Sequence, residues 1–187
     1  MSNDRVTKDQ QRAIERHYED YAKKMHEAFT EQVGSVVDCD IAFVDQTTYA
    51  EFIQSLNNPS CSYTFDIEPL KGPAIVDYSL PVAFGFITNA NGTEVPKEAR
   101  VLTANERDIM AKVITRNLAD MEANWEPIEK ISVAECALET NPEYIGVADP
   151  GDTVILVAFE VHGHNFSGLV NVCYPYKTLE PVLATFN

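Results

Sequence analysis

The chain has 187 residues, of which 45% are hydrophobic and 23% charged, and 29 acidic against 14 basic residues give a formal charge of −15. This composition is typical of a globular domain with a sizeable core, and no apolar run approaches the roughly 20 residues that span a bilayer. The lack of such a run excludes direct membrane insertion. The acidic charge and the lack of a Lys/Arg cluster exclude nucleic acid and an anionic membrane surface as partners, and they favour basic protein partners.

The start of the chain indicates a cytoplasmic protein. Residues 1–8 are polar and lack the apolar stretch of a signal peptide. The cysteines, Cys39, Cys61, Cys136 and Cys173, are scattered, and none belongs to a C-x-x-C pair. We interpret them as free, buried thiols.

The first half is predicted to begin with a long helix over residues 8–34. Thr7 is a plausible N-cap and Gly34 ends the run. Apolar residues recur at three- and four-residue steps on one face of this helix: Ile14, Tyr18, Tyr21, Met25, Phe29 and Val33. The next predicted elements are a strand at Asp40–Val44, a short helix at Thr48–Leu56, strands at Ser62–Ile67 and Pro73–Tyr78, and a short helix at Ser79–Ile87.

An exposed loop is predicted over Thr88–Arg100, because this segment contains Asn89-Ala90-Asn91-Gly92 and Pro96. A second long helix then begins at Thr103, where Glu106 completes a capping box, and it ends before Pro127. The remaining predicted elements are a strand at Ser132–Glu139, a short helix or turn at Asn141–Tyr144, a turn at Asp149–Asp152, and strands at Val154–Val161 and Gly168–Cys173. Because Val154–Phe159 is apolar on both faces, this strand is predicted to be central.

The two halves repeat at an offset of 94 residues. Phe65 falls on Phe159, Asp66 on Glu160, Ile67 on Val161, Ile75-Val76-Asp77 on Leu169-Val170-Asn171, and Pro81 on Pro175. An internal duplication of this kind predicts an α/β fold, a pseudo-two-fold α/β/α sandwich in which the halves share one core. We expect a single domain over residues 6–187, with a first half at 6–87, an inter-half loop at 88–102 and a second half at 103–187.

The hairpin turns of the two halves recur in position and differ in residue type. Glu68–Pro73 contains two prolines, a glycine and one basic residue, Lys71, whereas the second turn carries His162 and His164. We therefore interpret both turns as architectural. The two histidines are half of a metal site at most, and without a third ligand nearby in sequence we read them as solvated turn residues. No cofactor or metal motif is found.

Five segments together carry a family resemblance: "FIQSLNNPS", "DIEPLKGPAIVDYSLPVAF", "LTANERDIMAKVITRNLADMEANWEPI", "LETNPEYIGVADPGDTVILVAFEV" and "SGLVNVCYPYKTLEP". In order and spacing they resemble the middle domain of FliM, the bacterial flagellar motor switch family, from about Val6 to Pro181. The resemblance implies the fold shared with the CheC and CheX chemotaxis phosphatases, in agreement with the duplication.

The resemblance also implies a rotor scaffold in the flagellar basal body, at the cytoplasmic face of the inner membrane. Such domains stand beside their own copies and bind FliG through a Gly-Gly-x-Gly loop. The matching residues are Asn89, Ala90, Asn91 and Gly92, of which only Gly92 keeps the family's glycine; Asn tolerates a positive φ better than most residues. FliN and phosphorylated CheY are expected to bind parts of full-length FliM outside this chain. The chain is expected to be an excised middle domain, with a natural short form as the alternative.

The alternative function is that of a CheC-type phosphatase or adaptor acting on phosphorylated CheY. Those enzymes need Glu and Asn at E-x-x-N spacing on the long helices, so that both side chains position an attacking water. Here the residues three positions after a glutamate are others: Tyr18, Ala22 and Thr30 in the first helix, and Ile109 and Trp125 in the second. We therefore predict no enzymatic activity. The charged run Glu19–Lys24 is read as a solvated face, with a contact between copies as the alternative.

Overall fold

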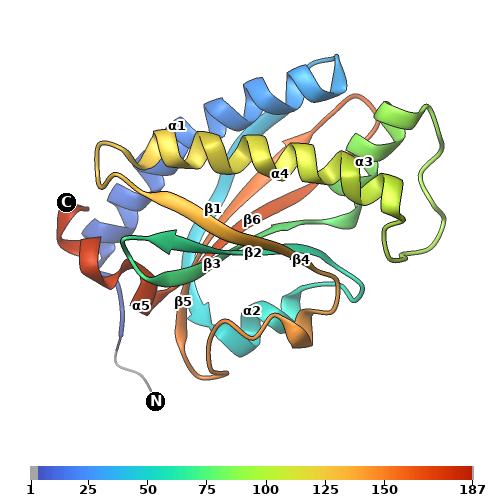
Figure 1. The fold of residues 1–187 in the computed structure, drawn as a ribbon. Coiled ribbons are helices and arrows are strands. Elements are labelled where there is room, and N and C mark those ends of the chain that lie inside the picture. Colours follow the sequence, from blue (N-terminus) through green and yellow to red (C-terminus); the bar gives the residue numbers. More distant parts are fainter. Residues whose placement is uncertain (1–3, 187) are drawn as a thin grey trace.

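The computed structural model describes residues 4–186, which form a six-stranded antiparallel sheet between two layers of helices (Figure 1). The long helices α1 (Lys8–Val33) and α4 (Ala104–Trp125) pack against one face of the sheet, and the short helix α2 (Tyr49–Ser55) packs against the other. This arrangement confirms the predicted α/β/α sandwich. Within residues 4–186, no helix has the length and apolar character needed to cross a membrane.

Both long helices begin and end where local chemistry predicts. Thr7 and Gln10 form a capping box at the start of α1, and Thr103 and Glu106 form one at the start of α4. Each box satisfies two backbone N–H groups that would otherwise lack a partner at a helix start. Gly34 ends α1 in the left-handed region at φ 82°, and its N–H donates to the Thr30 carbonyl over 2.9 Å.

The remaining elements follow the predicted order. They are β1 (Asp38–Thr48), β2 (Cys61–Glu68), β3 (Gly72–Tyr78), α3 (Leu80–Asn91), β4 (Ser132–Glu139), η1 (Pro142–Tyr144), β5 (Thr153–His162), β6 (Ser167–Pro175), α5 (Tyr176–Leu179) and η2 (Glu180–Thr185). β1 is longer than the predicted strand at Asp40–Val44 because β5 pairs with it from Asp38 to Thr48. β5 lies between β1 and β6, which confirms its interior position.

The predicted start of the inter-half loop at Thr88 is wrong by four residues. Helix α3 continues to Asn91, and only then does the chain leave the helix at Gly92. The physical reason is tertiary: Thr88 is buried, and Asn89 is held against the preceding turn by a bond from its side-chain Nδ2 to the Gly85 carbonyl at 2.6 Å. Sequence composition alone favours a loop there, because Asn and Gly are weak helix formers.

The strand order β1-β5-β6-β3-β2-β4 is symmetric. Strands β1, β2 and β3 of the first half are equivalent to β4, β5 and β6 of the second. Replacing each strand by its equivalent gives the same order read from the other edge of the sheet. The pairing registers repeat as well, since Asp38 pairs with His162 while Ser132, 94 residues after Asp38, pairs with Glu68, 94 residues before His162. The first strand of each half thus pairs with the hairpin of the other half. Neither half can close its own hydrogen-bond ladder, so the halves share one sheet and one core.

The duplication even repeats an irregularity. A β-bulge interrupts the pairing of β1 with β5 between Ile41 and Phe43, and the pairing of β4 with β2 is interrupted at the equivalent place, between Ala134 and Ala137. At the centre of the sheet, Asp77 of β3 pairs with Asn171 of β6. These two residues are 94 positions apart, so the axis that relates the halves passes between them.

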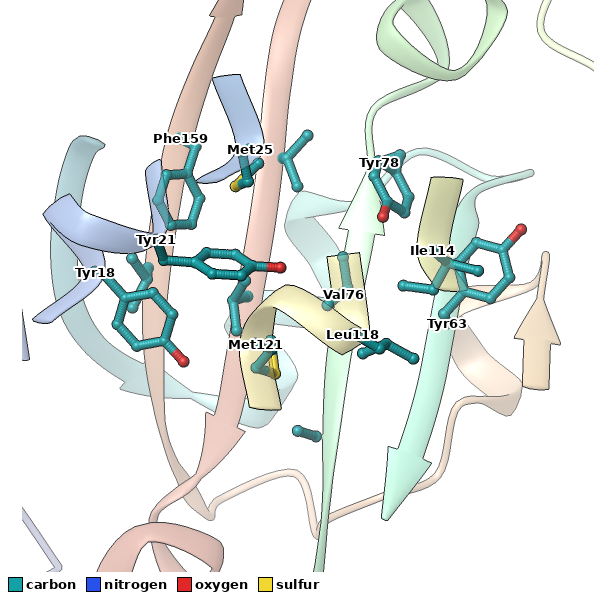
Figure 2. Close-up of a cluster of buried hydrophobic side chains, with 14 of the residues drawn as sticks. Tyr18, Tyr21, Met25, Tyr63, Val76, Tyr78, Ile114, Leu118, Met121 and Phe159 are labelled. Atoms are coloured by element: carbon teal, nitrogen blue, oxygen red, sulfur yellow. The ribbon is translucent and has the colours of Figure 1, made fainter. Parts of the chain in front are cut away.

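The main core lies between the sheet and the long helices (Figure 2). Side chains from α1, α4 and the sheet meet there: Tyr18, Tyr21 and Met25; Ile114, Leu118 and Met121; and Tyr63, Val76, Tyr78 and Phe159. The Tyr21 hydroxyl in this core is paired, since it donates to the Asn117 carbonyl over 2.8 Å. A smaller cluster joins α2 to the opposite face through Phe52, Ile75 and Val154.

The four cysteines are free, as predicted, but they are not all buried. Cys39, Cys61 and Cys173 are buried, and burial raises their pKa values. Cys136 is exposed on β4, at one edge of the sheet, which corrects the prediction of a buried thiol. The reason is that this part of the edge strand is uncovered on both faces, since every residue from Ala134 to Ala137 is exposed.

Candidate protein-interaction surface

The predicted binding residues Asn89, Ala90, Asn91 and Gly92 form the last turn and the cap of α3 (Figure 1). Gly92 has φ 65°, and its N–H donates to the Thr88 carbonyl over 2.8 Å. A Cβ at Gly92 would meet nothing within 4 Å. The backbone conformation, and not crowding, is therefore what favours glycine at this position.

Two other segments meet this helix end and hold its side chains. Asn89 Nδ2 donates to Asn165 Oδ1 in the β5–β6 turn over 3.2 Å, and Asn91 Nδ2 donates to Asn105 Oδ1 at the start of α4 over 2.9 Å. The surface thus joins both halves of the duplication. Asn105 and Asn165 were missed by sequence reasoning, because no spacing or motif links them to α3.

The whole connection that follows is exposed at one end of the molecule. Residues 89–101 are exposed except for the half-buried Pro96, whereas residues 82–88 immediately before them are buried. Val95 and Val101 each expose 48% of their surface. The segment therefore presents polar amide side chains and two aliphatic side chains at the surface. We name residues 89–101 the α3–α4 surface.

Two contacts of Arg100 hold the end of this surface that leads into α4. Its guanidinium donates to both carboxylate oxygens of Glu106, at 2.7 and 2.9 Å, and lies 5.1 Å from the ring centre of Phe84. The hydrogen bonds from Arg100, together with the Thr103 N–H, lower the pKa of Glu106 to about 2. Glu106 is thus ionised at neutral pH and ties the end of the connection to the start of α4.

Aromatic packing beneath the end of α3 supports the first residues of the α3–α4 surface. Phe86 of α3 lies 4.7 Å from the ring centre of Phe29 and 5.6 Å from that of Phe166. A Cβ at Gly85 would come within 2.3 Å of the Phe166 ring. The glycine therefore lets the β5–β6 turn approach α3 closely enough for Asn165 to reach Asn89.

The turn histidines do not converge. His162 Nε2 lies 3.9 Å from Glu160 Oε2, and both histidines are exposed. Across residues 4–186, no three His, Cys, Asp or Glu side chains lie together as metal ligands would.

A carboxylate and a carboxamide do line one hollow between α1 and α4, a cavity of about 160 Å³, but they are engaged elsewhere. Glu31 is paired with Arg116 at 2.8 Å, and Asn117 Oδ1 accepts from the Tyr78 hydroxyl over 2.5 Å. Asn117 Nδ2 is buried with no hydrogen-bond partner among the described residues. The two side chains come from different helices, so they are not the E-x-x-N pair that the phosphatase reaction needs.

Comparison with known proteins identifies the family. The model of the family described as "Flagellar motor switch protein FliM" matches residues 7–187. The chain is 32% identical to the flagellar motor switch protein FliM of Borreliella burgdorferi over 97% of its own length and 52% of that protein. It therefore spans about half the length of the curated relatives it matches.

Solved structures agree with this assignment at the level of the fold. A chain in the FliG–FliM complex from H. pylori has a TM-score of 0.91 at 22% identity, with 96% of this chain and all of that chain covered. The FliM middle domain from H. pylori has a TM-score of 0.88 at 22% identity, covering 96% and 99%. The chemotaxis protein CheX from Desulfovibrio desulfuricans is more distant, with a TM-score of 0.56 at 10% identity, covering 84% and 98%.

The extent of the family match, the duplicated α/β/α sandwich and the likeness to FliM middle domains all agree. This chain therefore belongs to the FliM family of flagellar motor switch proteins.

Proposed function

We propose that this domain is a scaffold of the flagellar rotor that binds FliG through Asn89–Gly92 and packs beside its own copies to transmit the chemotactic direction signal. The observation that carries the proposal is an exposed, hydrogen-bonded segment at the place where the family resemblance puts the FliG-binding loop. A FliM-like chain of the same fold has been crystallised in complex with FliG, which supports the choice of partner.

The α3–α4 surface suits a protein partner for two physical reasons. The side chains of Asn89 and Asn91 are already held by hydrogen bonds, so binding would immobilise few additional rotamers. The half-exposed Val95 and Val101 supply apolar area beside these amides, and a core of apolar contacts within a polar rim is the usual composition of a binding patch.

We assign FliN and phosphorylated CheY to other parts of full-length FliM, and we place the domain at the cytoplasmic face of the inner membrane, in the basal body. The signal would then pass through this domain as a rigid unit, because both halves share one sheet and cannot move independently without breaking ladder hydrogen bonds.

The test uses the backbone conformation of Gly92. Gly92→Val places a β-branched residue in the left-handed region, which costs about 1–2 kcal/mol locally and displaces the helix end. Calorimetric titration with the FliG middle domain should show at least tenfold weaker binding. The matched control is Gly146→Val, which has φ 60° and lies beside α2 on the opposite face of the sheet.

The control variant should carry the same kind of backbone penalty and bind FliG with unchanged affinity. Equal affinity of the Gly92 variant and the unmodified domain would refute the assignment of FliG to this helix end. Packing between copies is tested separately, by measuring whether the mass of the domain in solution rises with protein concentration in sedimentation equilibrium.

A further inference from the structure

A hollow of about 320 Å³ opens at the centre of the sheet, on the face that carries α2. It begins where α3 begins, at Leu80 and Pro81, so it lies at the opposite end of that helix from Asn89–Gly92 (Figure 1). The residues around it come from both halves of the chain: Ser55–Asn57, Ser60, Asp77–Pro81, Gly168, Leu169 and Asn171. The proposed FliG contact uses none of them.

Asp77 is the charged residue of this hollow. It exposes only 4% of its surface, and its Oδ1 accepts from the Ser62 hydroxyl over 2.7 Å. Ser60 and Ser62 are joined by a further hydroxyl contact at 2.9 Å, and the Asn171 side chain also hydrogen-bonds to Asp77. All of these partners are neutral.

The carboxyl of Asp77 therefore lacks a counter-charge. Burial raises its pKa to about 6, and hydrogen bonds from Ser62 and Asn171 oppose that rise only in part. No basic side chain is among the groups that act on this pKa. At neutral pH the hollow holds an ionised carboxylate stabilised by neutral donors alone, an arrangement that favours a bound cation.

The surroundings select the kind of cation. A multivalent metal ion needs several hard ligands, and the described residues offer one carboxylate here. A guanidinium prefers both carboxylate oxygens free for a bidentate contact, whereas Asp77 already accepts bonds from Ser62 and Asn171. An ammonium group is a compact charge that can bind to a single carboxylate oxygen. Apolar residues around the hollow, Leu56, Leu80, Pro81 and Leu169, suit an aliphatic stem.

We propose that this hollow binds an alkylammonium group, with its ammonium on the Asp77 carboxylate and its methylene stem against Leu56, Leu80 and Leu169. The group is either a free aliphatic amine or the side chain of a lysine. The formal charge of −15 adds a long-range attraction for such a cation. The proposal does not depend on FliG binding, because it concerns another surface of the domain.

The test is a chemical-shift titration of the ¹⁵N-labelled domain with n-butylammonium chloride at pH 7.5, with n-butanol as the uncharged control. We expect butylammonium to shift the signals of the Asp77, Leu169 and Asn171 amides until they saturate. The apparent affinity of butanol, measured from the same signals, should be at least tenfold weaker. Asp77→Asn should abolish the preference for the ammonium. This variant keeps the shape of the side chain, and the equivalent position of the other half is already an asparagine.

A second measurement needs no variant. Between pH 7.5 and pH 5 the ionised fraction of a carboxyl with a pKa near 6 falls about tenfold, so butylammonium affinity should fall about tenfold as well. The other titratable groups near Asp77 are the thiols of Cys61 and Cys173 and the hydroxyl of Tyr78. Burial raises the pKa of each of them, so they stay neutral over this range.

The source of the group is decided by comparing butylammonium with the capped peptide acetyl-Gly-Lys-Gly-amide. Tighter binding of the peptide identifies a protein lysine as the ligand, and tighter binding of the free amine identifies a small molecule; both results support the alkylammonium site. Equal shifts with butanol and butylammonium, or an affinity that does not change between pH 7.5 and pH 5, would overturn the proposal.

Discussion

Removing the charge of Asp77 is expected to stabilise the fold at neutral pH. Burial raises the pKa of this carboxyl from 3.8 to about 6. Since a tenfold change in a protonation equilibrium corresponds to about 1.4 kcal/mol, ionising Asp77 inside the folded domain costs about 3 kcal/mol. Asp77→Asn keeps the acceptor for the Ser62 hydroxyl and removes that cost.

The sign of the pH dependence follows from the raised pKa. Below pH 3.8 the carboxyl is protonated in both the folded and the unfolded states, so it imposes no penalty. Between pH 3.8 and about 6 the folded state holds the proton more tightly, and stability falls as the pH rises through this window. Above it the full penalty of about 3 kcal/mol remains.

Urea unfolding at pH 4 and pH 8 measures the effect. The free energy of unfolding of Asp77→Asn should exceed that of the unmodified domain by about 3 kcal/mol at pH 8 and by much less at pH 4. Asp66→Asn on the neighbouring strand is the matched control, because Asp66 is exposed and its replacement removes the same charge from solvent. A difference for Asp77→Asn that is the same at both pH values would refute the reasoning.

Three further predictions test other parts of the structure. Gly85→Ala should destabilise the domain by about 1–3 kcal/mol in urea unfolding, because its Cβ would lie 2.3 Å from the Phe166 ring, and adding Phe166→Leu should recover part of that loss. Thiol titration of the native domain should show one fast-reacting group, Cys136, and three that react only after unfolding; several fast thiols would contradict the buried placement of the others. The domain should leave the dephosphorylation rate of phosphorylated CheY at its spontaneous value, since its long helices lack the E-x-x-N pair.

Local chemistry determined most of the elements. The N-cap at Thr7, the capping box at Thr103, the apolar stripes of the long helices and the 94-residue repeat could all be predicted from the sequence, because each depends on residues close in sequence or at one constant offset. The capping box at Thr7 was found only in the structure. The repeat also predicted that the two halves share one core. Family resemblance, carried by long segments in order, placed the candidate site at Asn89–Gly92.

Tertiary structure decided what depends on distant partners. The first strands are exchanged between the halves, and α3 extends to Asn91. Asn89 contacts Asn165, 76 positions away, and Asn91 contacts Asn105, 14 positions away. Nothing in a local pattern specifies such pairs.

The same holds for Asp77. In sequence it is one carboxylate in a strand, and an exposed position would be the usual expectation. Only the pairing of β3 with β6 places it opposite its own repeat partner, Asn171, in the hollow near the end of α2, where it exposes only 4% of its surface. The sequence by itself determined which elements form and that they occur twice; the fold decided which charge is buried, because burial depends on the neighbours that the other half brings.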